Sequence, residues 1–256
     1  MVDIHTHIIP SVDDGSIDIS DSINILRNAK KSGYTAIVAT PHYIEGSYIA
    51  NNKEKNKLIE AIRSEAKIQN IDIEIYLGNE IFITENIEKL LNYGKVSSIN
   101  NSRYILIELP RSGGTYGLQS CIFNLFSLGY IPIIAHPERY SFVQKNPNQL
   151  IDYIEQGVLF QLNSGSLLGC YGKSAHKTSK ILLKHNMIHF IATDTHSSKS
   201  SSYDQTAEVY KLVSKLVGVE NANNLMTQNP INVINNGKIV ISQPMEYNKG
   251  LFDFIK

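Results

Sequence analysis

Histidine and carboxylate side chains recur in this chain directly after short β-branched segments. The first example is His5-x-His7, which closes the apolar start of the chain and is soon followed by Asp13 and Asp14. Because residues i and i+2 of a strand point to the same face, both imidazoles can bind one ion. Metal binding is therefore the first chemistry that these residue types indicate.

Metal-binding residue types also follow most of the later apolar runs. The nine candidate ligands are His5, His7, Asp14, His42, Glu80, Glu108, His136, Asp194 and His196. Taken alone, a histidine or glutamate in such a place is more often an ordinary polar residue, and Asp14 also fits an Asx turn before Gly15. Their occurrence at six separate strand ends favours one shared site. Three other histidines lie in or beside helical segments or at a strand start, and we interpret them as structural: His176, His185 and His189.

Nine candidate ligands exceed the roughly four that one tetrahedral ion takes. Imidazole and carboxylate ligands without thiolate suit two or three ions such as Mn²⁺, Fe or Zn²⁺. Such a cluster lowers the pKa of bound water, holds a phosphoryl oxygen and offsets charge on the leaving oxygen. Hydrolysis of a phosphate ester needs all three effects, so the residues predict a metal-dependent phosphoester hydrolase.

The elements that must position these residues alternate between strand and helix. The expected strands cover residues 1–4, 35–39, 73–77, 104–109, 131–135, 159–162 and 189–192. The expected helices cover residues 21–31, 51–69, 87–93, 117–128, 147–156, 173–185 and 203–217. Near-continuous apolar runs such as residues 104–107 are typical of strands buried on both faces. The alternation predicts an α/β fold, either a barrel or a doubly wound sheet, and the absence of Gly-x-Gly-x-x-Gly after the first strand disfavours a dinucleotide-binding sheet.

Length and composition set outer limits on the function. The chain has 256 residues and a formal net charge of zero. We expect one domain over residues 1–256, with a C-terminal tail, 241–256, whose role the sequence does not indicate. Zero net charge argues against a large nucleic-acid surface. No segment resembles a signal peptide or reaches the roughly 18 apolar residues of a membrane span, so we expect a cytoplasmic protein without direct membrane insertion.

The two cysteines exclude another phosphatase mechanism. Cysteine-based tyrosine phosphatases need an arginine six residues after the thiolate, whereas Ser127 follows Cys121 and His176 follows Cys170 at that spacing. A disulfide framework is also disfavoured, because neither cysteine has a partner nearby in the sequence.

The ordered set of motifs resembles the polymerase and histidinol phosphatase (PHP) superfamily, over nearly the whole chain to about residue 235. The matching stretches are residues 3–10 (DIHTHIIP), 12–15 (VDDG), 39–42 (ATPH), 78–81 (GNEI), 101–104 (NSRY), 107–108 (IE), 134–140 (IAHPERY) and 192–196 (ATDTH). Their details are similar to the bacterial manganese-dependent protein-tyrosine phosphatases of capsule and exopolysaccharide gene clusters. This resemblance implies a distorted seven-stranded (β/α) barrel of PHP type, with a three-metal cluster, Mn²⁺ above all, on the nine residues named above.

The resemblance also implies a substrate and a phosphate-binding residue. The substrate would be a phosphorylated, membrane-associated bacterial tyrosine kinase, whose dephosphorylation regulates polysaccharide synthesis. Arg139 matches a family arginine that binds the substrate phosphate, which suits the bidentate guanidinium fork; the alternative is a surface salt bridge with Glu138 or Glu155. Family members often carry a second arginine after the final Asp-x-His. Here that loop has only Lys199, a point donor that we consider as a substitute.

Two other functions remain open at this stage. One is a small-molecule phosphoesterase of the same superfamily, acting for example on histidinol phosphate or a nucleotide. The other is a catalytically inactive metal-binding scaffold, which would be expected to have lost ligands, although all nine positions hold competent residue types.

Overall fold

The computed structural model describes residues 1–112, 116–200 and 202–248, and shows an α/β fold with parallel sheets. A three-stranded sheet has the order β1-β2-β4, and a six-stranded sheet has the order β3-β5-β6-β7-β8-β9. All ladders between these strands are parallel. The strands are β1 (Val2–Thr6), β2 (Ala36–Ala39), β3 (His42–Tyr43), β4 (Glu74–Leu77), β5 (Glu80–Phe82), β6 (Tyr104–Glu108), β7 (Ile131–Ala135), β8 (Leu159–Asn163) and β9 (Phe190–Ala192).

Each of the seven expected strand segments overlaps one of these strands, and β3 and β5 are additional. These two follow β2 and β4 after interruptions of only two residues, so the chain passes from one sheet to the other at two neighbouring places. On the other side, an isolated parallel bridge joins Thr6 to Thr195, and the His7 N–H donates to the Thr195 carbonyl at 2.9 Å. The carboxyl ends of strands in both sheets therefore lie close together.

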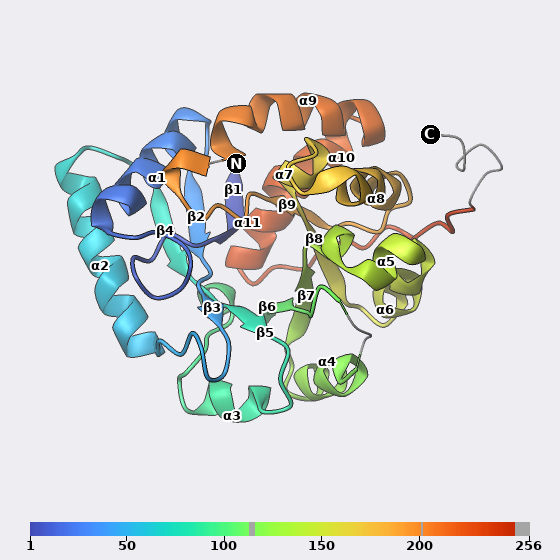
Figure 1. Ribbon diagram of the computed structural model, residues 1–256, viewed down its shortest axis with the longest axis horizontal. Coiled ribbons are helices and arrows are strands. Elements are labelled where there is room, and N and C mark those ends of the chain that lie inside the picture. The colour runs from blue at the N-terminus through green and yellow to red at the C-terminus, as the bar shows by residue number, and fades with distance from the viewer. Residues whose placement is uncertain (113–115, 201, 249–256) are drawn as a thin grey trace.

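The helices lie around the outside of the strands (Figure 1). The α-helices are α1 (Ile19–Lys31), α2 (Asn52–Ile68), α3 (Ile87–Asn92), α4 (Leu118–Ser127), α5 (Ser141–Lys145), α6 (Ile151–Glu155), α7 (Ser164–Leu167), α8 (Gly172–Lys184), α9 (Thr206–Val217), α10 (Val219–Asn223) and α11 (Asn229–Ile234). Shorter 3₁₀ turns are η1 (Ile99–Asn101), η2 (Pro137–Arg139), η3 (Pro147–Leu150), η4 (Ser198–Ser200) and η5 (Ser202–Gln205), and η6 (Asn224–Gln228) is a π-helical turn. The expected helices 147–156 and 203–217 each begin as a 3₁₀ turn, and α5, α7, α10 and α11 were not predicted.

Alternate residues of the strands enter different hydrophobic clusters. Along β6, Ile105 and Ile107 pack in the cluster beneath the helices, whereas Tyr104 and Leu106 pack in a second cluster with residues of the other strands. This alternation follows from the two-residue period of a strand. It confirms that the continuous apolar run is buried on both faces, as sequence patterning predicted.

Side-chain caps define where the two long N-terminal helices begin. The Asp18 carboxylate accepts a hydrogen bond from the Asp21 N–H at the start of α1. At the start of α2, Asn51 and Glu54 form a reciprocal capping box, which satisfies two N–H groups that the helix itself leaves unpaired.

The described part of the C-terminal tail, residues 241–248, runs beside α8 and η3. The Met245 N–H donates to the His185 carbonyl at 2.9 Å, and Tyr247 exchanges two backbone hydrogen bonds with the Asn148 side chain. Residues 249–256 lie outside the described residues. Among the described residues, no helix is long and apolar enough to cross a membrane.

Candidate functional site

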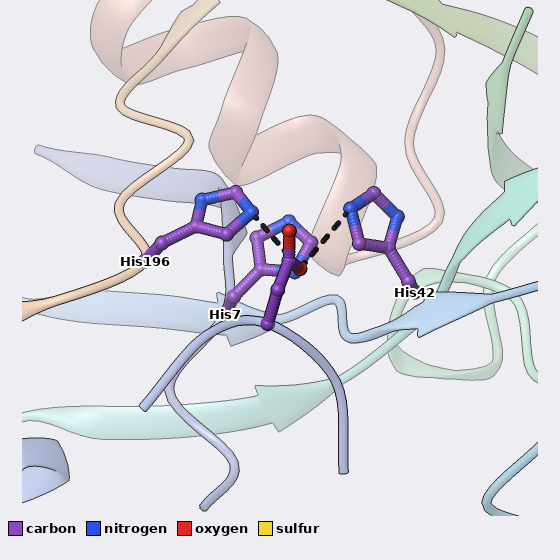
Figure 2. A group of neighbouring side chains, drawn as sticks. His7, His42 and His196 are labelled. Carbon is purple, nitrogen blue, oxygen red and sulfur yellow. Dashed lines mark ion pairs between the residues drawn. The ribbon is translucent and has the colours of Figure 1, made fainter. Parts of the chain in front are cut away.

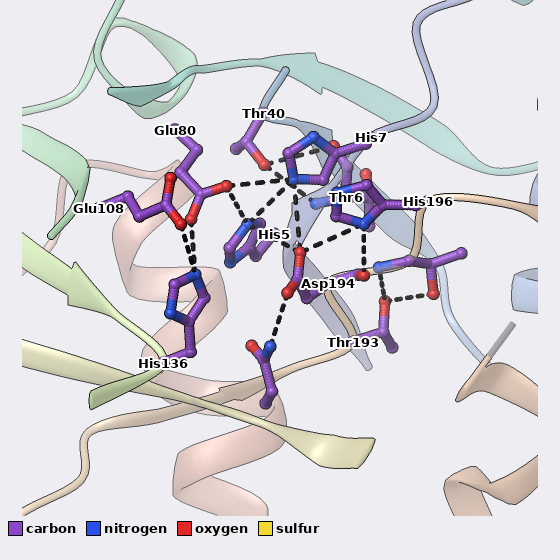
Figure 3. A network of polar contacts seen from close by, with 12 residues as sticks. His5, Thr6, His7, Thr40, Glu80, Glu108, His136, Thr193, Asp194 and His196 are labelled. Atoms are coloured by element: carbon purple, nitrogen blue, oxygen red, sulfur yellow. Dashed lines mark hydrogen bonds and ion pairs between the residues drawn. The ribbon is translucent and has the colours of Figure 1, made fainter. Parts of the chain in front are cut away.

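The nine candidate ligands lie at the ends of the strands or on the connections that follow them, and Figure 3 shows seven of them together: His5, His7, Glu80, Glu108, His136, Asp194 and His196. His5 lies in β1 and Glu108 ends β6, whereas His42 and Glu80 are the first residues of β3 and β5. The other candidates lie on the connections that follow the strands: His7, Asp14, His136, Asp194 and His196. The two short strands that the sequence did not predict thus carry two of the candidates.

Two of the candidates have a left-handed backbone. His136, directly after β7, has φ 35°, and Asp194, two residues after β9, has φ 55°. This region is uncommon for residues other than glycine and costs free energy, so it persists where the surroundings impose it. In both cases the turn directs the side chain into the cluster rather than along the strand.

Gly15 allows the loop after β1 to pack against His7. A β-carbon at position 15 would lie 2.3 Å from the His7 carbonyl oxygen and 2.5 Å from the His7 Cβ. The close approach places the Asp13 carboxylate 2.8 Å from His7 Nδ1, and the same oxygen accepts from the His42 N–H at 2.8 Å. A hydrogen bond at Nδ1 fixes the ring and leaves Nε2 available for a metal.

Four of the candidates form the first potential ion site: His7, Asp14, His42 and His196. Their ligating atoms all lie within 4.8 Å of one another. Asp14 Oδ1 is 3.6 Å from His42 Nε2 and 3.5 Å from His196 Nε2. The three imidazoles point toward one another in Figure 2.

A second potential ion site is fully buried and is formed by His5, His7, Glu80 and Asp194. The Nε2 atoms of His5 and His7 are 3.2 Å apart, and Glu80 Oε2 is 3.1 Å and 3.3 Å from them, respectively. The other nitrogen of His5, Nδ1, contacts Gln161 Oε1 at 2.8 Å. Both histidines therefore have their second nitrogen bonded to a polar neighbour and Nε2 directed into the cluster.

The third group consists of His42, Glu80 and Glu108. His136 belongs to none of the three groups, but its Nε2 lies 2.9 Å from Glu80 Oε1 and 3.8 Å from Glu108 Oε1. Three residues are each shared by two groups, namely His7, His42 and Glu80, and Glu80 also contacts His136 (Figure 3).

Unpaired polar atoms show that the cluster suits cations. Glu80 Oε2, Asp194 Oδ1 and His42 Nδ1 are buried and have no hydrogen-bond partner among the described residues. Buried polar atoms are rarely left in this way without an ion or water. Burial and the neighbouring Glu80 charge raise the pKa of Glu108 to about 8. Burial alone would lower the pKa of His5, but Glu80 and Asp194 raise it to about 9. In both shifts the contribution of Glu80 reflects negative charge that bound cations would offset.

A cavity of about 450 Å³ opens over the cluster. It is lined by Asp14, His42, Glu80, Glu108, Arg111, His136, Arg139, Cys170, Tyr171, Asp194, His196 and Gln205. A larger cavity of about 630 Å³ lies between α2 and β4, and it contains none of the candidate residues. The larger cavity is therefore not the one that contains the candidate ligands.

Arg139 contacts the cluster directly. Its Nη1 donates to Asp194 Oδ2 at 3.0 Å, and its guanidinium carbon lies 4.3 Å from the centre of the Tyr171 ring. The alternative partner Glu138 is instead buried and accepts from the Asn163 N–H and the Ser166 hydroxyl. Lys199 is exposed on η4 and does not line the cavity.

Sequence reasoning missed several residues that shape this site. Asp13 carries a detectable signal, because it lies beside Asp14 in the tight turn before Gly15. Arg111, Tyr171 and Gln161 carry none, since each reaches the cluster only through the spatial order of the strands and their loops.

Comparison with known proteins extends the similarity to the whole fold. Residues 1–235 match the family model described as "Capsular polysaccharide synthesis, CpsB/CapC". CapC of Staphylococcus aureus is 39% identical over 198 residues, which cover 77% of each chain. Tyrosine-protein phosphatase YwqE of Bacillus subtilis is 35% identical, covering 83% of this chain and 84% of that protein.

A solved structure shows the same arrangement of elements. It belongs to a study of YwqE from Bacillus subtilis and CpsB from Streptococcus pneumoniae, described as metal-dependent tyrosine phosphatases. It superimposes with a TM-score of 0.91 at 33% identity, covering 97% of this chain and 100% of the other. The family match, the relatives and the shared structure agree, and the chain belongs to the CpsB/CapC family of capsular polysaccharide synthesis.

Proposed function

We propose that this protein is a metal-dependent protein-tyrosine phosphatase that acts in capsular polysaccharide synthesis. The observation that carries the proposal is the buried cluster of histidines and carboxylates beneath an open cavity, in which several buried polar atoms have no hydrogen-bond partner among the described residues. The names of the similar proteins YwqE and CpsB supply the reaction, hydrolysis of phosphotyrosine.

The residues that would hold the ions are His5, His7, Asp14, His42, Glu80, Glu108, His136, Asp194 and His196. When bound, such ions lower the pKa of a coordinated water and neutralise charge on phosphoryl and leaving oxygens. Mn²⁺ is the ion that we expect, although Fe or Zn²⁺ also suits imidazole and carboxylate ligands. His7, His42 and Glu80 would each contribute to two of the groups.

The remaining residues orient the ligands and the substrate. Asp13 and Gln161 hold the second nitrogens of His7 and His5, which fixes the orientation of each ring. Arg139 would bind a non-bridging phosphate oxygen through the donors that Asp194 does not occupy, because a guanidinium carries five N–H groups.

We extend the proposal to the architecture and the cellular setting. If β2 with β3 and β4 with β5 each count as one interrupted strand, the strands form a distorted seven-stranded barrel of PHP type, with β1 beside β9. Residues 1–256 would form one domain in the cytoplasm.

The substrate would be a phosphorylated, membrane-associated tyrosine kinase. The open side of the cavity suits a phosphotyrosine on a protein segment better than a fully enclosed small molecule.

The test is hydrolysis of phosphotyrosine, phosphoserine and phosphothreonine peptides, and of histidinol phosphate, with Mn²⁺ and with chelator. We expect Mn²⁺-dependent release of phosphate from phosphotyrosine, lost in His136→Ala and reduced in Arg139→Ala. Turnover of histidinol phosphate without turnover of any phosphotyrosine peptide would refute the protein substrate and leave only the metallohydrolase. Absence of all turnover in protein that binds Mn²⁺ would support the inactive scaffold instead.

A further inference from the structure

Arg111 brings a second guanidinium to the cavity. It lies three residues beyond Glu108, the last residue of β6, and lines the same cavity as Arg139 and the candidate ligands. Arg111 is thus close to the cluster on the Glu108 side, whereas Arg139 contacts it on the Asp194 side.

The two arginines differ in whether their guanidinium groups are paired with other side chains. Arg139 is paired with Asp194 and packs on the Tyr171 ring. Arg111 is an exposed residue, and its guanidinium makes no hydrogen bond or ion pair with the described residues. Four carboxylates line the cavity, from Asp14, Glu80, Glu108 and Asp194, and Lys199 does not reach it. Among the described lining residues, Arg111 is therefore the one permanently charged cation without a hydrogen bond or ion pair to another described side chain.

The backbone of Arg111 is held in place by the segment that follows Arg139. The Tyr140 hydroxyl accepts a hydrogen bond from the Leu109 N–H at 2.9 Å, and the Ser141 N–H donates to the Arg111 carbonyl at 3.1 Å. The Tyr140 side chain is fully buried, so this connection is rigid. The two hydrogen bonds fix the spacing of the segments that carry Arg111 and Arg139.

We infer that Arg111 is a second phosphate-binding residue and, with Arg139, confers affinity for a phosphomonoester dianion. Cations held by the carboxylates would offset their charge, but Arg139 is already paired with Asp194, so Arg111 is the guanidinium in the cavity whose donors are free for a phosphate oxygen. Guanidinium groups from two different strand ends can contact different non-bridging oxygens of one phosphate. This inference rests on the proposed function, because it assigns a substrate-binding residue to the same site.

Arg111→Gln removes the charge at an exposed position and is expected to leave the melting temperature of the protein unchanged. We expect the KM for para-nitrophenyl phosphate and for a phosphotyrosine peptide with neutral flanks to rise at least about tenfold, as for loss of a hydrogen bond to a charged group. The kcat should change much less, and Arg111→Lys should restore part of the affinity. Lys199→Gln is the matched control, since it removes one nearby charge that does not line the cavity; its KM should stay within about twofold of the wild type.

Binding of inorganic phosphate to the Mn²⁺-loaded protein, measured by calorimetry, tests Arg111 without any turnover. We expect the dissociation constant to increase about tenfold in Arg111→Gln and to stay unchanged in Lys199→Gln. Equal phosphate affinity in wild type and Arg111→Gln would overturn the inference, as would a KM effect limited to peptides with acidic flanks. A wild type that binds phosphate through Arg111 but hydrolyses no phosphotyrosine would refute the proposed function and leave the phosphate site in place.

Discussion

Substitution of Gly15 tests whether the loop after β1 controls metal affinity. In Gly15→Ala the new β-carbon would lie 2.3 Å from the His7 carbonyl oxygen, whereas ordinary contact begins at 3.4 Å. The loop must therefore move by about 1 Å, because the neighbouring atom is backbone and the interior is close-packed. Gly15 needs no positive φ, so this steric effect is not mixed with backbone strain.

A movement of that size breaks the hydrogen bonds of Asp13. The bonds from its carboxylate to His7 Nδ1 and to the His42 N–H are both 2.8 Å long, and a shift of about 1 Å takes them beyond hydrogen-bond range. Loss of a partner that orients a metal-binding histidine typically costs about 10-fold to 100-fold in metal affinity. Asp14, on the same loop, moves as well. We therefore expect the Mn²⁺ concentration for half-maximal activity to rise by about 10-fold to 100-fold, with a smaller change in activity at saturating Mn²⁺.

The measurement is a Mn²⁺ titration of phosphatase activity, with calorimetric Mn²⁺ binding beside it. Gly237→Ala is the matched control, because its β-carbon would meet only contacts of 3.4 Å, at a site away from the cavity. The control should titrate like the wild type. A Gly15→Ala protein with wild-type Mn²⁺ dependence would refute the view that close packing of this loop orients His7.

Two further predictions concern other parts of the molecule. In Tyr171→Leu, Arg139 loses the aromatic face that lies 4.3 Å from it, so kcat/KM should fall by roughly 2-fold to 30-fold, whereas Tyr171→Phe should keep most of the activity; equal losses in both variants would contradict a ring contact. Burial lowers the pKa of His189 from 6.5 to about 4, so the unfolded chain binds the proton first as the pH falls. The stability contributed by neutral His189 is thus complete above pH 6.5 and is lost as the pH falls toward 4. By pH 5 the free energy of unfolding has decreased by about 2 kcal/mol through this group. His189→Asn keeps an acceptor for the Phe160 N–H without titrating, so urea unfolding in chelator at pH 7.5 and pH 5 should show this loss in the wild type alone.

The sequence predicted which residues would meet but not how the chain brings them there. The strand-end positions of His5, Glu108 and Asp194 follow from alternation of strand and helix, and parallel strands place those ends together. The short strands β3 and β5 were missed because they have only two and three residues, too few for a periodic pattern. The left-handed turns at His136 and Asp194 were also invisible, because neither residue is a glycine that would have indicated a positive φ.

The interruptions before β3 and β5 show why such features escape a sequence pattern. Asn79, in the second interruption, donates from Nδ2 to the Pro41 carbonyl in the first at 3.0 Å. Its Oδ1 accepts from the amino group of Lys55, a fully buried residue of α2 that also bonds to the Lys95 carbonyl at 3.3 Å. Burial lowers the pKa of Lys55 to about 7, which shows how much desolvation this contact costs. A lysine on an amphipathic helix is normally interpreted as exposed, so no sequence rule would have assigned it this position.

The contacts of Lys55 and Asn79 support the segments that carry two of the candidate ligands. His42 follows Pro41 and Glu80 follows Asn79, so the one side chain of Asn79 joins the two segments that present these candidate ligands. Because β3 and β5 pair with each other at His42 and Glu80, a change in either interruption would move both ligands together. His42 and Glu80 also each belong to two of the three groups of the cluster. The geometry of the metal site therefore depends on polar contacts outside the nine ligands, and these contacts, rather than the ligand motifs, are what the three-dimensional structure adds.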